Sequence, residues 1–293
     1  MPGLWFEESY TQDLSFSYRV KQVLFSGKTR FQKVDVIELA ALGKTLFLDN
    51  RMQSAQLDEA LYHEFLVHPA MQTHPGPKSV FIAGGGEGAT LREVLRYPGV
   101  DRAVMVDIDQ ELVEVCRRHL PEWSSGAFDD HRAELVFADA RARLEQDDSF
   151  YDVVISDLSE PWEGGESALL FTKEFYQLVY RRLDDEGVFV AQVGAGDPLF
   201  PDLAASVVKT LAEVFPVVRL YTVFVFSFFL PWAFVIATKA PQPDPAACKP
   251  LAGTRHFDRV SFASALGLPK QLREALRVKG RVLTDKDPFV WNA

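Results

Sequence analysis

The chain has 293 residues, of which 47% are hydrophobic and 25% charged, an ordinary globular composition with enough apolar material for one full domain and a smaller one. Its 41 acidic and 31 basic residues give a formal net charge of -10. This balance argues against sequence-independent binding to nucleic acid, which needs Lys and Arg to neutralise phosphates, and it suits a cationic substrate.

Residues 1–60 are predicted to form a small antiparallel β domain. Three short apolar or alternating runs are strand candidates: residues 16–25, 31–39 and 45–48. Residues 26–28 and 42–44 have turn chemistry and separate these runs. Because no helix lies between the candidate strands, we expect neighbouring strands to run in opposite directions.

Residues 61–293 are predicted to form a larger α/β domain. A helical pattern at residues 57–71 is broken by the Pro-rich residues 74–77, and strands and helices then alternate. The expected strands are residues 80–83, 103–106, 135–137, 152–156 and 187–192. The expected helices are residues 89–96, 111–119, 140–144, 175–183 and 203–214. This alternation predicts a parallel, doubly wound sheet.

Residues 223–238 form a nearly continuous apolar run that could be mistaken for a membrane span. The run is short for a span and contains Pro231, so two buried strands around a turn are the better prediction. The first residues lack a basic start followed by an apolar core, and Cys116 and Cys248 have no metal or redox spacing. We therefore expect a cytoplasmic protein without a membrane anchor.

A Gly-rich turn at residues 84–88 follows one expected strand and opens a helix. Glycines at such a turn let the backbone approach a ligand closely. Alone they suit NAD, FAD or S-adenosylmethionine equally, or merely a tight loop. Asp107, 20 positions after Glu87, ends the next strand, where such folds place a carboxylate on ribose hydroxyls; Asp109 is the competitor, and a helix cap is the structural alternative. Asp139 follows the third strand, where it could bind an adenine amino group or cap a helix.

Glu87 is a departure from a dinucleotide site. A pyrophosphate favours backbone amides with no negative charge nearby, whereas a carboxylate in the turn favours an ammonium group and repels the carboxylate of intact S-adenosylmethionine. A ligand with adenosine and an amine but no carboxylate fits this pattern. Decarboxylated S-adenosylmethionine is such a molecule.

Two carboxylates, Asp157 and Glu160, follow the expected strand 152–156, at the edge where open α/β sheets bind ligands. A polyamine amine has a pKa of roughly 10, so it needs a group that removes its proton before it can act as a nucleophile. Asp157 is the candidate for that role and Glu160 for gripping the cation; both could instead be turn and cap residues. The acidic, Gly-containing residues 163–166 fit a lid equally as well as a solvated loop.

Several motifs in order resemble the polyamine aminopropyltransferases, the spermidine/thermospermine synthase family, over almost the whole chain. They are residues 48–54 (LDNRMQS), 62–64 (YHE), 67–69 (VHP), 84–93 (GGGEGATLRE), 106–109 (VDID), 157–161 (DLSEP) and 175–176 (FY). The resemblance implies a small N-terminal β domain and a Rossmann-like, methyltransferase-type domain, assembled as homodimers or homotetramers. It also implies in-line transfer of an aminopropyl group from decarboxylated S-adenosylmethionine to a polyamine, with no metal and no prosthetic group.

The resemblance implies a role for each site residue, with Asp157 as the base. The residues implied for the donor are Gln32, Gly84, Gly86, Glu87, Asp107 and Asp139, of which Glu87 binds the amine, Asp107 the ribose and Asp139 the adenine. The residues implied for the acceptor are Tyr62, His63, Glu160 and Gln192. For His63, a hydrogen-bonding role in the core is an equal alternative.

The chain departs from typical spermidine synthases, which resemble Gly-Gly-Gly-Asp-Gly, Glu-Ile-Asp, Tyr-Gln-Glu and Asp-Ser-x-Asp-Pro at these places. It has Glu87, Asp107, His63 and Glu160 instead, and the first three resemble thermospermine synthases and triamine/agmatine aminopropyltransferases. A channel tyrosine expected near residues 228–232 is missing. We therefore expect a triamine or agmatine as acceptor, with putrescine possible. The alternatives are a methyltransferase that uses intact S-adenosylmethionine and a non-catalytic polyamine-binding protein.

Overall fold

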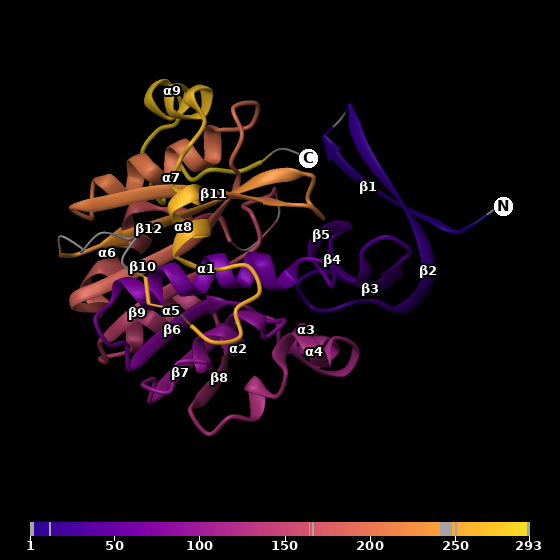
Figure 1. The fold of residues 1–293 in the computed structure, drawn as a ribbon, viewed down its shortest axis with the longest axis horizontal. Helices are drawn as coiled ribbons and strands as arrows, with labels where there is room; N and C mark the ends of the chain where they lie inside the picture. Colours follow the sequence, from indigo (N-terminus) through magenta and orange to yellow (C-terminus); the bar gives the residue numbers. More distant parts are fainter. Residues whose placement is uncertain are drawn as a thin grey trace.

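The computed structural model describes residues 3–11, 13–163, 165, 167–240, 248–249 and 251–291, which form two sheets (Figure 1). The first is a five-stranded antiparallel sheet in the order β1-β2-β3-β4-β5. Its strands are β1 (Trp5–Thr11), β2 (Leu14–Lys28), β3 (Lys33–Leu39), β4 (Gly43–Leu48) and β5 (Arg51–Ala55).

Three of these strands were expected, whereas β1 and β5 were missed because their polar residues hide the alternation. The predicted turn at residues 26–28 is wrong, since Gly27 pairs with Val34 inside the β2–β3 ladder. The chain reverses just after it, where Thr29 Oγ1 accepts the backbone N–H groups of Phe31 and Gln32, both at 3.1 Å.

The second sheet has seven strands in the order β11-β12-β10-β9-β6-β7-β8. They are β6 (Ser79–Gly84), β7 (Arg102–Asp107), β8 (Ala133–Phe137), β9 (Tyr151–Asp157), β10 (Leu183–Ala195), β11 (Val217–Val225) and β12 (Leu230–Thr238). The expected parallel order holds for β6 to β10, but β12 runs antiparallel to both β10 and β11. The sheet is therefore mixed, because β11 and β12 are joined by a tight hairpin and only antiparallel neighbours can be joined that way.

This hairpin contains the apolar run at residues 223–238, which covers the end of β11, the turn and β12, so the prediction of two strands around a turn is confirmed. Among the residues that the structure describes, no helix is long and apolar enough to cross a membrane.

Helices pack on both faces of the central sheet and bury two apolar layers. One layer contains side chains from α1, α2 and α8, and the other contains side chains from α5, α6, α7 and α9. The helices are α1 (Glu59–Thr73), α2 (Ala89–Leu95), α3 (Gln110–His119), α4 (Pro121–Ser124), α5 (Ala140–Gln146), α6 (Lys173–Arg182), α7 (Asp202–Ala212), α8 (Arg259–Ala265) and α9 (Lys270–Val278), with 3₁₀ turns at Ala127–Asp129 and Ala168–Phe171. The sequence predicted six of them but missed the short helices α4, α8 and α9.

The two sheets meet through α3 and α4. Buried Val34 and Leu46 of the first sheet share an apolar cluster with Leu112 of α3 and Trp123 of α4. The Trp123 indole donates a 2.7 Å hydrogen bond to Ser54 Oγ. This contact brings the first sheet over the carboxyl ends of β6, β7 and β9.

Candidate active site

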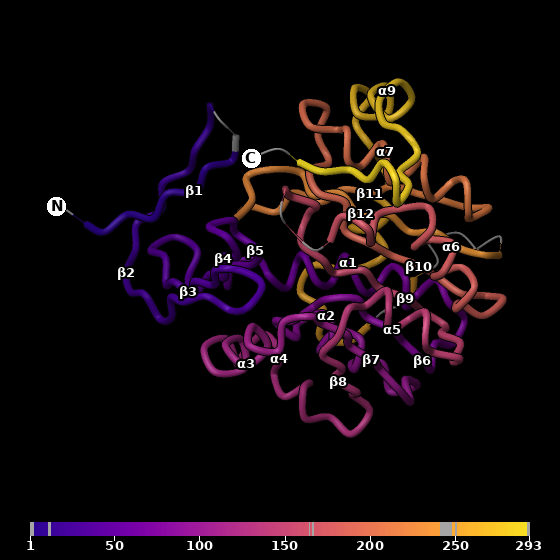
Figure 2. The backbone as a smooth tube through the Cα atoms, turned by 180° about the vertical axis from the view of Figure 1, so that it is seen from behind, coloured from indigo at the N-terminus to yellow at the C-terminus, as the bar shows by residue number. Residues whose placement is uncertain are grey.

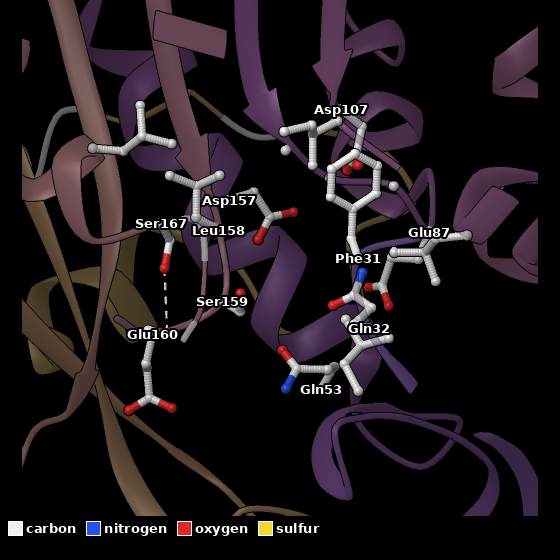
Figure 3. Close-up of a pocket in the computed structure, with 18 of the residues that line it drawn as sticks. Phe31, Gln32, Gln53, Glu87, Asp107, Asp157, Leu158, Ser159, Glu160 and Ser167 are labelled. Carbon is white, nitrogen blue, oxygen red and sulfur yellow. Dashed lines mark hydrogen bonds between the residues drawn. The ribbon is translucent and has the colours of Figure 1, made fainter. Parts of the chain in front are cut away.

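A cavity of about 420 Å³ lies where the first sheet faces the carboxyl ends of the central strands (Figure 3). Nine of the predicted site residues line it: Gln32, Tyr62, Gly84, Gly86, Glu87, Asp107, Asp139, Asp157 and Glu160. Figure 3 shows Asp157 and Glu160 on one side, with Asp107, Glu87 and Gln32 on the other. The predicted residues His63 and Gln192 are not among the described residues that line it.

The turn after β6 has a backbone conformation and close contacts that require glycine. Gly84 and Gly85 have φ angles of 81° and 79°, a region that side chains rarely adopt, and the Gly85 N–H donates to the Asp157 carbonyl at 3.0 Å. A Cβ at Gly84 would collide with that carbonyl, and a Cβ at Gly86 would come within 2.7 Å of Asp107 Oδ2. The turn therefore passes directly against the ends of β9 and β7.

Asp157 ends β9, and two hydroxyl groups fix its carboxylate. Tyr62 on α1 donates to Oδ1 at 3.1 Å, and Thr90 on α2 donates to Oδ2 at 2.6 Å. Burial, and then the Asp157 charge, raise the pKa of Tyr62 well above its usual value, so the phenol keeps its proton and remains a donor. Sequence reasoning missed Thr90, although it follows the Gly-rich turn directly.

Glu87 is buried and belongs to a row of alternating charges. His63 Nε2 lies 2.7 Å from Glu87 Oε1, His63 Nδ1 contacts the Glu59 backbone oxygen at 2.6 Å, and Arg92 contacts the Glu59 carboxylate at 2.9 Å. Burial alone would lower the pKa of His63, but Glu87 and Glu59 raise it to about 10. Burial raises the pKa of Glu87, and the charge and hydrogen bond of His63 oppose this rise. His63 is therefore an imidazolium behind Glu87 that favours the ionised carboxylate in the wall of the cavity.

Asp107 and Asp109 have different surroundings. Asp107 lines the cavity, and burial raises its pKa to about 6. Asp109 is buried, caps α3 by accepting the Leu112 N–H at 3.0 Å, and accepts hydrogen bonds from Gln32 Nε2 at 3.0 Å and Thr29 Oγ1 at 2.6 Å. Asp109 thus holds Gln32 in place, and Asp107 is the carboxylate open to a ligand.

Asp139 combines the two settings that the sequence allowed, since it lines the cavity and also caps α5 by accepting the Ala142 N–H at 2.7 Å. Gln192 lies behind the loop that follows β9. Its Nε2 donates to the Leu158 carbonyl at 2.5 Å, and its Oε1 accepts the Gly194 N–H at 2.8 Å. Both ends of this amide are therefore used inside the protein.

Glu160 lies at the other end of the cavity, close to Arg51 at the start of β5. Burial raises the pKa of Glu160 to about 7, although Arg51 and a hydrogen bond with Trp162 act to lower it. The Arg51 guanidinium lies 3.3 Å from the centroid of the Trp162 ring. Arg51 belongs to the 48–54 motif, but the sequence did not predict its contact with Trp162 or its position beside Glu160.

Two predictions from the sequence concern the acidic loop at residues 163–166 and the missing channel tyrosine. Of the acidic loop 163–166, Glu163 and Gly165 line the cavity, whereas Gly164 and Glu166 lie outside the described residues. Near the missing channel tyrosine, Phe228 meets Tyr62 edge to face at 6.2 Å. Aromatic packing therefore supports Tyr62 on the side of the β11–β12 turn.

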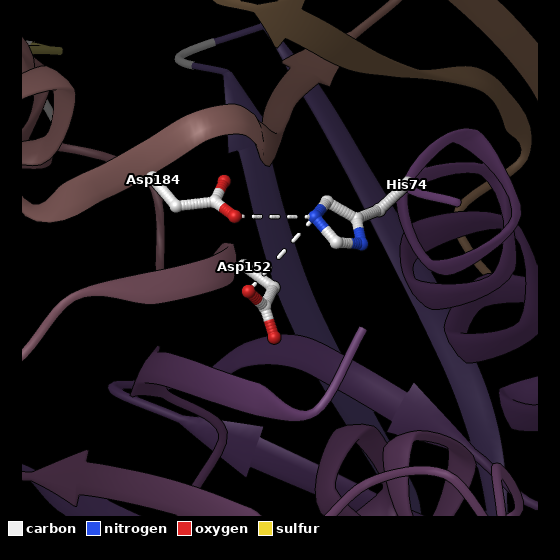
Figure 4. A group of neighbouring side chains, drawn as sticks. All are labelled: His74, Asp152 and Asp184. Carbon is white, nitrogen blue, oxygen red and sulfur yellow. Dashed lines mark ion pairs between the residues drawn. The ribbon is translucent and has the colours of Figure 1, made fainter. Parts of the chain in front are cut away.

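His74, Asp152 and Asp184 form the one group of possible metal ligands that the described part of the chain contains (Figure 4). They lie where β9 and β10 begin, at the edge opposite the cavity, and His74 Nε2 is 3.5 Å from Asp184 and 3.9 Å from Asp152. His74 Nδ1 accepts the Gly76 N–H at 3.2 Å, so the proton of a neutral ring is on Nε2, the atom that a metal would need. This arrangement fits a neutral imidazole whose Nε2–H faces two carboxylates, and not a metal ligand.

Comparisons with known proteins identify similar sequences and structures. Residues 59–245 match the model of the spermine/spermidine synthase domain, and residues 4–56 match the spermidine synthase tetramerisation domain. A polyamine aminopropyltransferase from Aeropyrum pernix is 41% identical over 96% of this chain and 93% of its own length. Thermospermine synthase ACAULIS5 from Arabidopsis thaliana is 38% identical over 97% of this chain and 86% of its own length.

Two solved structures share the fold. A spermidine synthase in complex with the transition-state analogue AdoDATO has a TM-score of 0.86 and 30% identity, covering 94% of this chain and 95% of its own. The spermidine synthase from Thermotoga maritima has a TM-score of 0.86 and 32% identity, covering 95% and 96%.

Proposed function

This chain belongs to the spermine/spermidine synthase family, and on that premise we propose how its cavity carries out aminopropyl transfer. It is an aminopropyltransferase that moves the aminopropyl group of decarboxylated S-adenosylmethionine to an amine acceptor. The acceptor nitrogen forms a bond to the methylene carbon next to the sulfonium, the carbon–sulfur bond breaks, and the sulfur keeps the electron pair in methylthioadenosine.

The donor binds at the ends of β6, β7 and β8. Its adenine contacts Asp139, its ribose hydroxyls bind Asp107, and Gln32 contacts the adenosine and methylthio part. The backbone of Gly84 and Gly86 lies beside it, without a Cβ in the way. The separate position of each carboxylate along one cavity supports this arrangement.

The amine of the donor's aminopropyl group binds Glu87. Two features support this role: Glu87 lines the cavity, and His63 pairs with it from behind at 2.7 Å. An ionised carboxylate here attracts the ammonium of the decarboxylated donor and repels the carboxylate of intact S-adenosylmethionine. His63 acts through Glu87 and not by direct contact with a substrate.

Asp157 is the base that receives the proton of the attacking amine. Its two oxygens are fixed by Tyr62 and Thr90, so its position does not change while the proton transfers. Glu160 binds a charged nitrogen of the acceptor further along the cavity, and Gln192 supports the loop between the two carboxylates from behind. The Asp157 carboxylate, fixed by two hydroxyl groups beside the glycine turn, with Glu160 further along the same cavity, is the observation that carries the proposal.

The acceptor is a triamine or agmatine, with putrescine as the shorter alternative. Glu160 and Arg51 form the end of the cavity that a second or third nitrogen would reach. The pairing of His63 with Glu87, the combination that resembles thermospermine synthases and triamine/agmatine aminopropyltransferases, supports the longer acceptors.

Residues 1–60 form the assembly domain and residues 61–293 the catalytic domain of a homodimer or homotetramer that works in the cytoplasm. The exposed apolar side chains of Leu4, just before β1, Trp5 on β1 and Leu14 on β2 support an interface there. Cys116 is buried and outside any disulfide, which suits a reducing compartment.

The test is incubation of the pure protein with decarboxylated S-adenosylmethionine and a panel of putrescine, cadaverine, agmatine, spermidine and norspermidine. Methylthioadenosine and the amine products are measured by mass spectrometry. Release that depends on one acceptor supports the proposal and identifies the substrate. Donor binding without release would support a polyamine-binding protein instead, and equal affinity for intact S-adenosylmethionine would support a methyltransferase.

A further inference from the structure

Residues 281–291 follow the last helix, α9, and are fixed along the catalytic domain. Leu283 is fully buried, and its carbonyl accepts the Lys173 N–H at 2.9 Å. Both oxygens of Asp285 bind the Arg141 guanidinium, at 2.8 and 2.7 Å, and Thr172 Oγ1 donates to Asp285 at 2.7 Å. The segment is therefore held firmly before it reaches its end.

The end of this segment pairs with the loop that follows β9. Trp291 donates its backbone N–H to the Pro161 carbonyl at 2.8 Å and accepts the Glu163 N–H at 3.0 Å. These two bonds make a parallel bridge between Trp162 and Trp291. In Figures 1 and 2 the yellow end of the chain runs back towards the first sheet, which agrees with this pairing.

Three side chains from three separate segments form a stack beside the cavity. The Trp291 ring centroid is 5.8 Å from that of Trp162, and the Arg51 guanidinium lies 3.3 Å from the Trp162 centroid. Arg51 comes from β5, Trp162 from the loop after β9, and Trp291 from the 281–291 segment. The stack therefore joins the first sheet to the loop that follows β9.

Trp162 connects this stack to Glu160. The Trp162 N–H donates to the Glu160 carbonyl at 2.9 Å, and the Trp162 side chain acts to lower the pKa of the Glu160 carboxyl. Arg51 and Trp162 line the cavity beside Glu160, whereas Trp291 is not among the described residues that do so. Any effect of Trp291 on a substrate must therefore pass through Trp162.

The position of Trp291 is not explained by a hydrogen bond from its indole nitrogen. Within the described part of the structure, Trp291 Nε1 is buried and has no hydrogen-bond partner. The ring face and the backbone bridge thus carry the interaction, and another aromatic ring could replace the indole.

We propose that Trp291 is a positioning residue for the amine acceptor: through its bridge and ring contact with Trp162, against which Arg51 packs, it holds Glu160 in the position that binds a cationic nitrogen. The inference rests on the proposed role of Glu160 in acceptor binding. It predicts that a change at Trp291 affects the acceptor and not the donor, because the donor residues belong to other segments of the chain.

The experiment measures steady-state kinetics with the acceptor that the panel identifies, and donor binding by calorimetry, in the full chain. Trp291→Ala is expected to raise the acceptor KM by roughly tenfold, which corresponds to about 1.4 kcal/mol, with donor affinity unchanged within about twofold. Trp291→Phe is expected to restore the acceptor KM, because it keeps the ring. Val290→Ala is the matched control, since Val290 is the adjacent residue and its side chain is 39% exposed.

An unchanged acceptor KM in Trp291→Ala would overturn the inference, and so would a parallel loss of donor affinity and melting temperature that Trp291→Phe does not repair. If Trp291→Ala does not fold, Trp291→Leu replaces it, because leucine keeps apolar volume without an aromatic face. A wild-type protein that fails to release methylthioadenosine with any acceptor would refute the proposed function itself, which distinguishes the two failures.

Discussion

His63 Nε2 lies 2.7 Å from Glu87 Oε1, so two of the residues in which this chain departs from typical spermidine synthases touch each other. The longer Glu87 side chain and the charged His63 therefore form one unit. Behind them, Glu59 and Arg92 extend the alternation of charge, so that no member is buried without an opposite neighbour.

His63→Gln is expected to weaken donor binding by roughly tenfold at neutral pH, because a buried Glu87 without its imidazolium partner takes up a proton and no longer attracts an ammonium. Binding should recover above neutral pH as Glu87 ionises. Calorimetry of donor binding across pH measures this. His68→Gln is the matched control, since His68 lies on the same helix and pairs with Glu93 at 3.1 Å outside the cavity wall; an equal loss of affinity in both variants would contradict the prediction.

The same pair makes the stability of the protein dependent on pH. The pKa of His63 is about 10 in the folded protein against 6.5 for an unperturbed histidine, so its contribution is fully present below pH 6.5 and disappears as pH rises through 10. The free energy of unfolding should fall across this window in the wild type, and His63→Gln should fall less. Denaturant titrations at several pH values test the difference, and parallel curves for the two proteins would exclude His63 as the cause.

Asp157→Asn is expected to fold normally, bind the donor and lose turnover by roughly 100-fold or more, because the amide cannot accept the proton of the amine. Thr90→Val should lose less, since it removes one of the two hydroxyl donors that fix the carboxylate. Single-turnover release of methylthioadenosine gives the rate. Glu186→Gln, an exposed carboxylate where β10 begins, is the control and should match the wild type; normal turnover in Asp157→Asn would refute its role as base.

Alternation of strands and helices predicted the core of the fold because each element from β6 to α7, apart from the short helix α4, has a local signature: an apolar run, a Gly turn or a cap. Strands β1 and β5 have no such signature, since their polar residues become a sheet only by pairing with β2 and β4. The antiparallel direction of β12 relative to β10 could not be predicted either. The sequence of an apolar hairpin does not indicate which strand of the sheet it pairs with.

The cavity carboxylates could be found from the sequence because they end parallel strands, and the ends of neighbouring strands converge. The sequence could not predict the contacts of four other residues, because each contact depends on packing between segments far apart in the chain. These residues are His63, Thr90, Arg51 and Trp291. The contact of Trp291 with Trp162 bridges 129 positions, and no local pattern reports such a pair.

His74→Ala is expected to lower the free energy of unfolding by about 1–3 kcal/mol, because it removes the imidazole that lies between Asp152 and Asp184 and leaves the two carboxylates facing each other. Kinetic constants should stay unchanged, since this cluster lies at the edge of the sheet opposite the cavity. Added zinc or a chelator should not move the melting temperature of the wild type. A rise in melting temperature with zinc that His74→Ala abolishes would instead reveal a metal site.

Glu160 should make acceptor binding depend on pH near neutrality. Burial raises its pKa to about 7, so the carboxyl is neutral below that pH and attracts a cationic nitrogen only above it. The acceptor KM should therefore fall as pH rises from about 6 to 8, and Glu160→Gln should remove this step and raise KM at pH 8 by roughly tenfold, the value of a lost charge-assisted hydrogen bond. The acceptor's own titration is common to both proteins, so the difference between their profiles isolates the carboxyl. Superimposable profiles would show that Glu160 does not hold the acceptor, and the charged nitrogen would then have to bind elsewhere along the cavity.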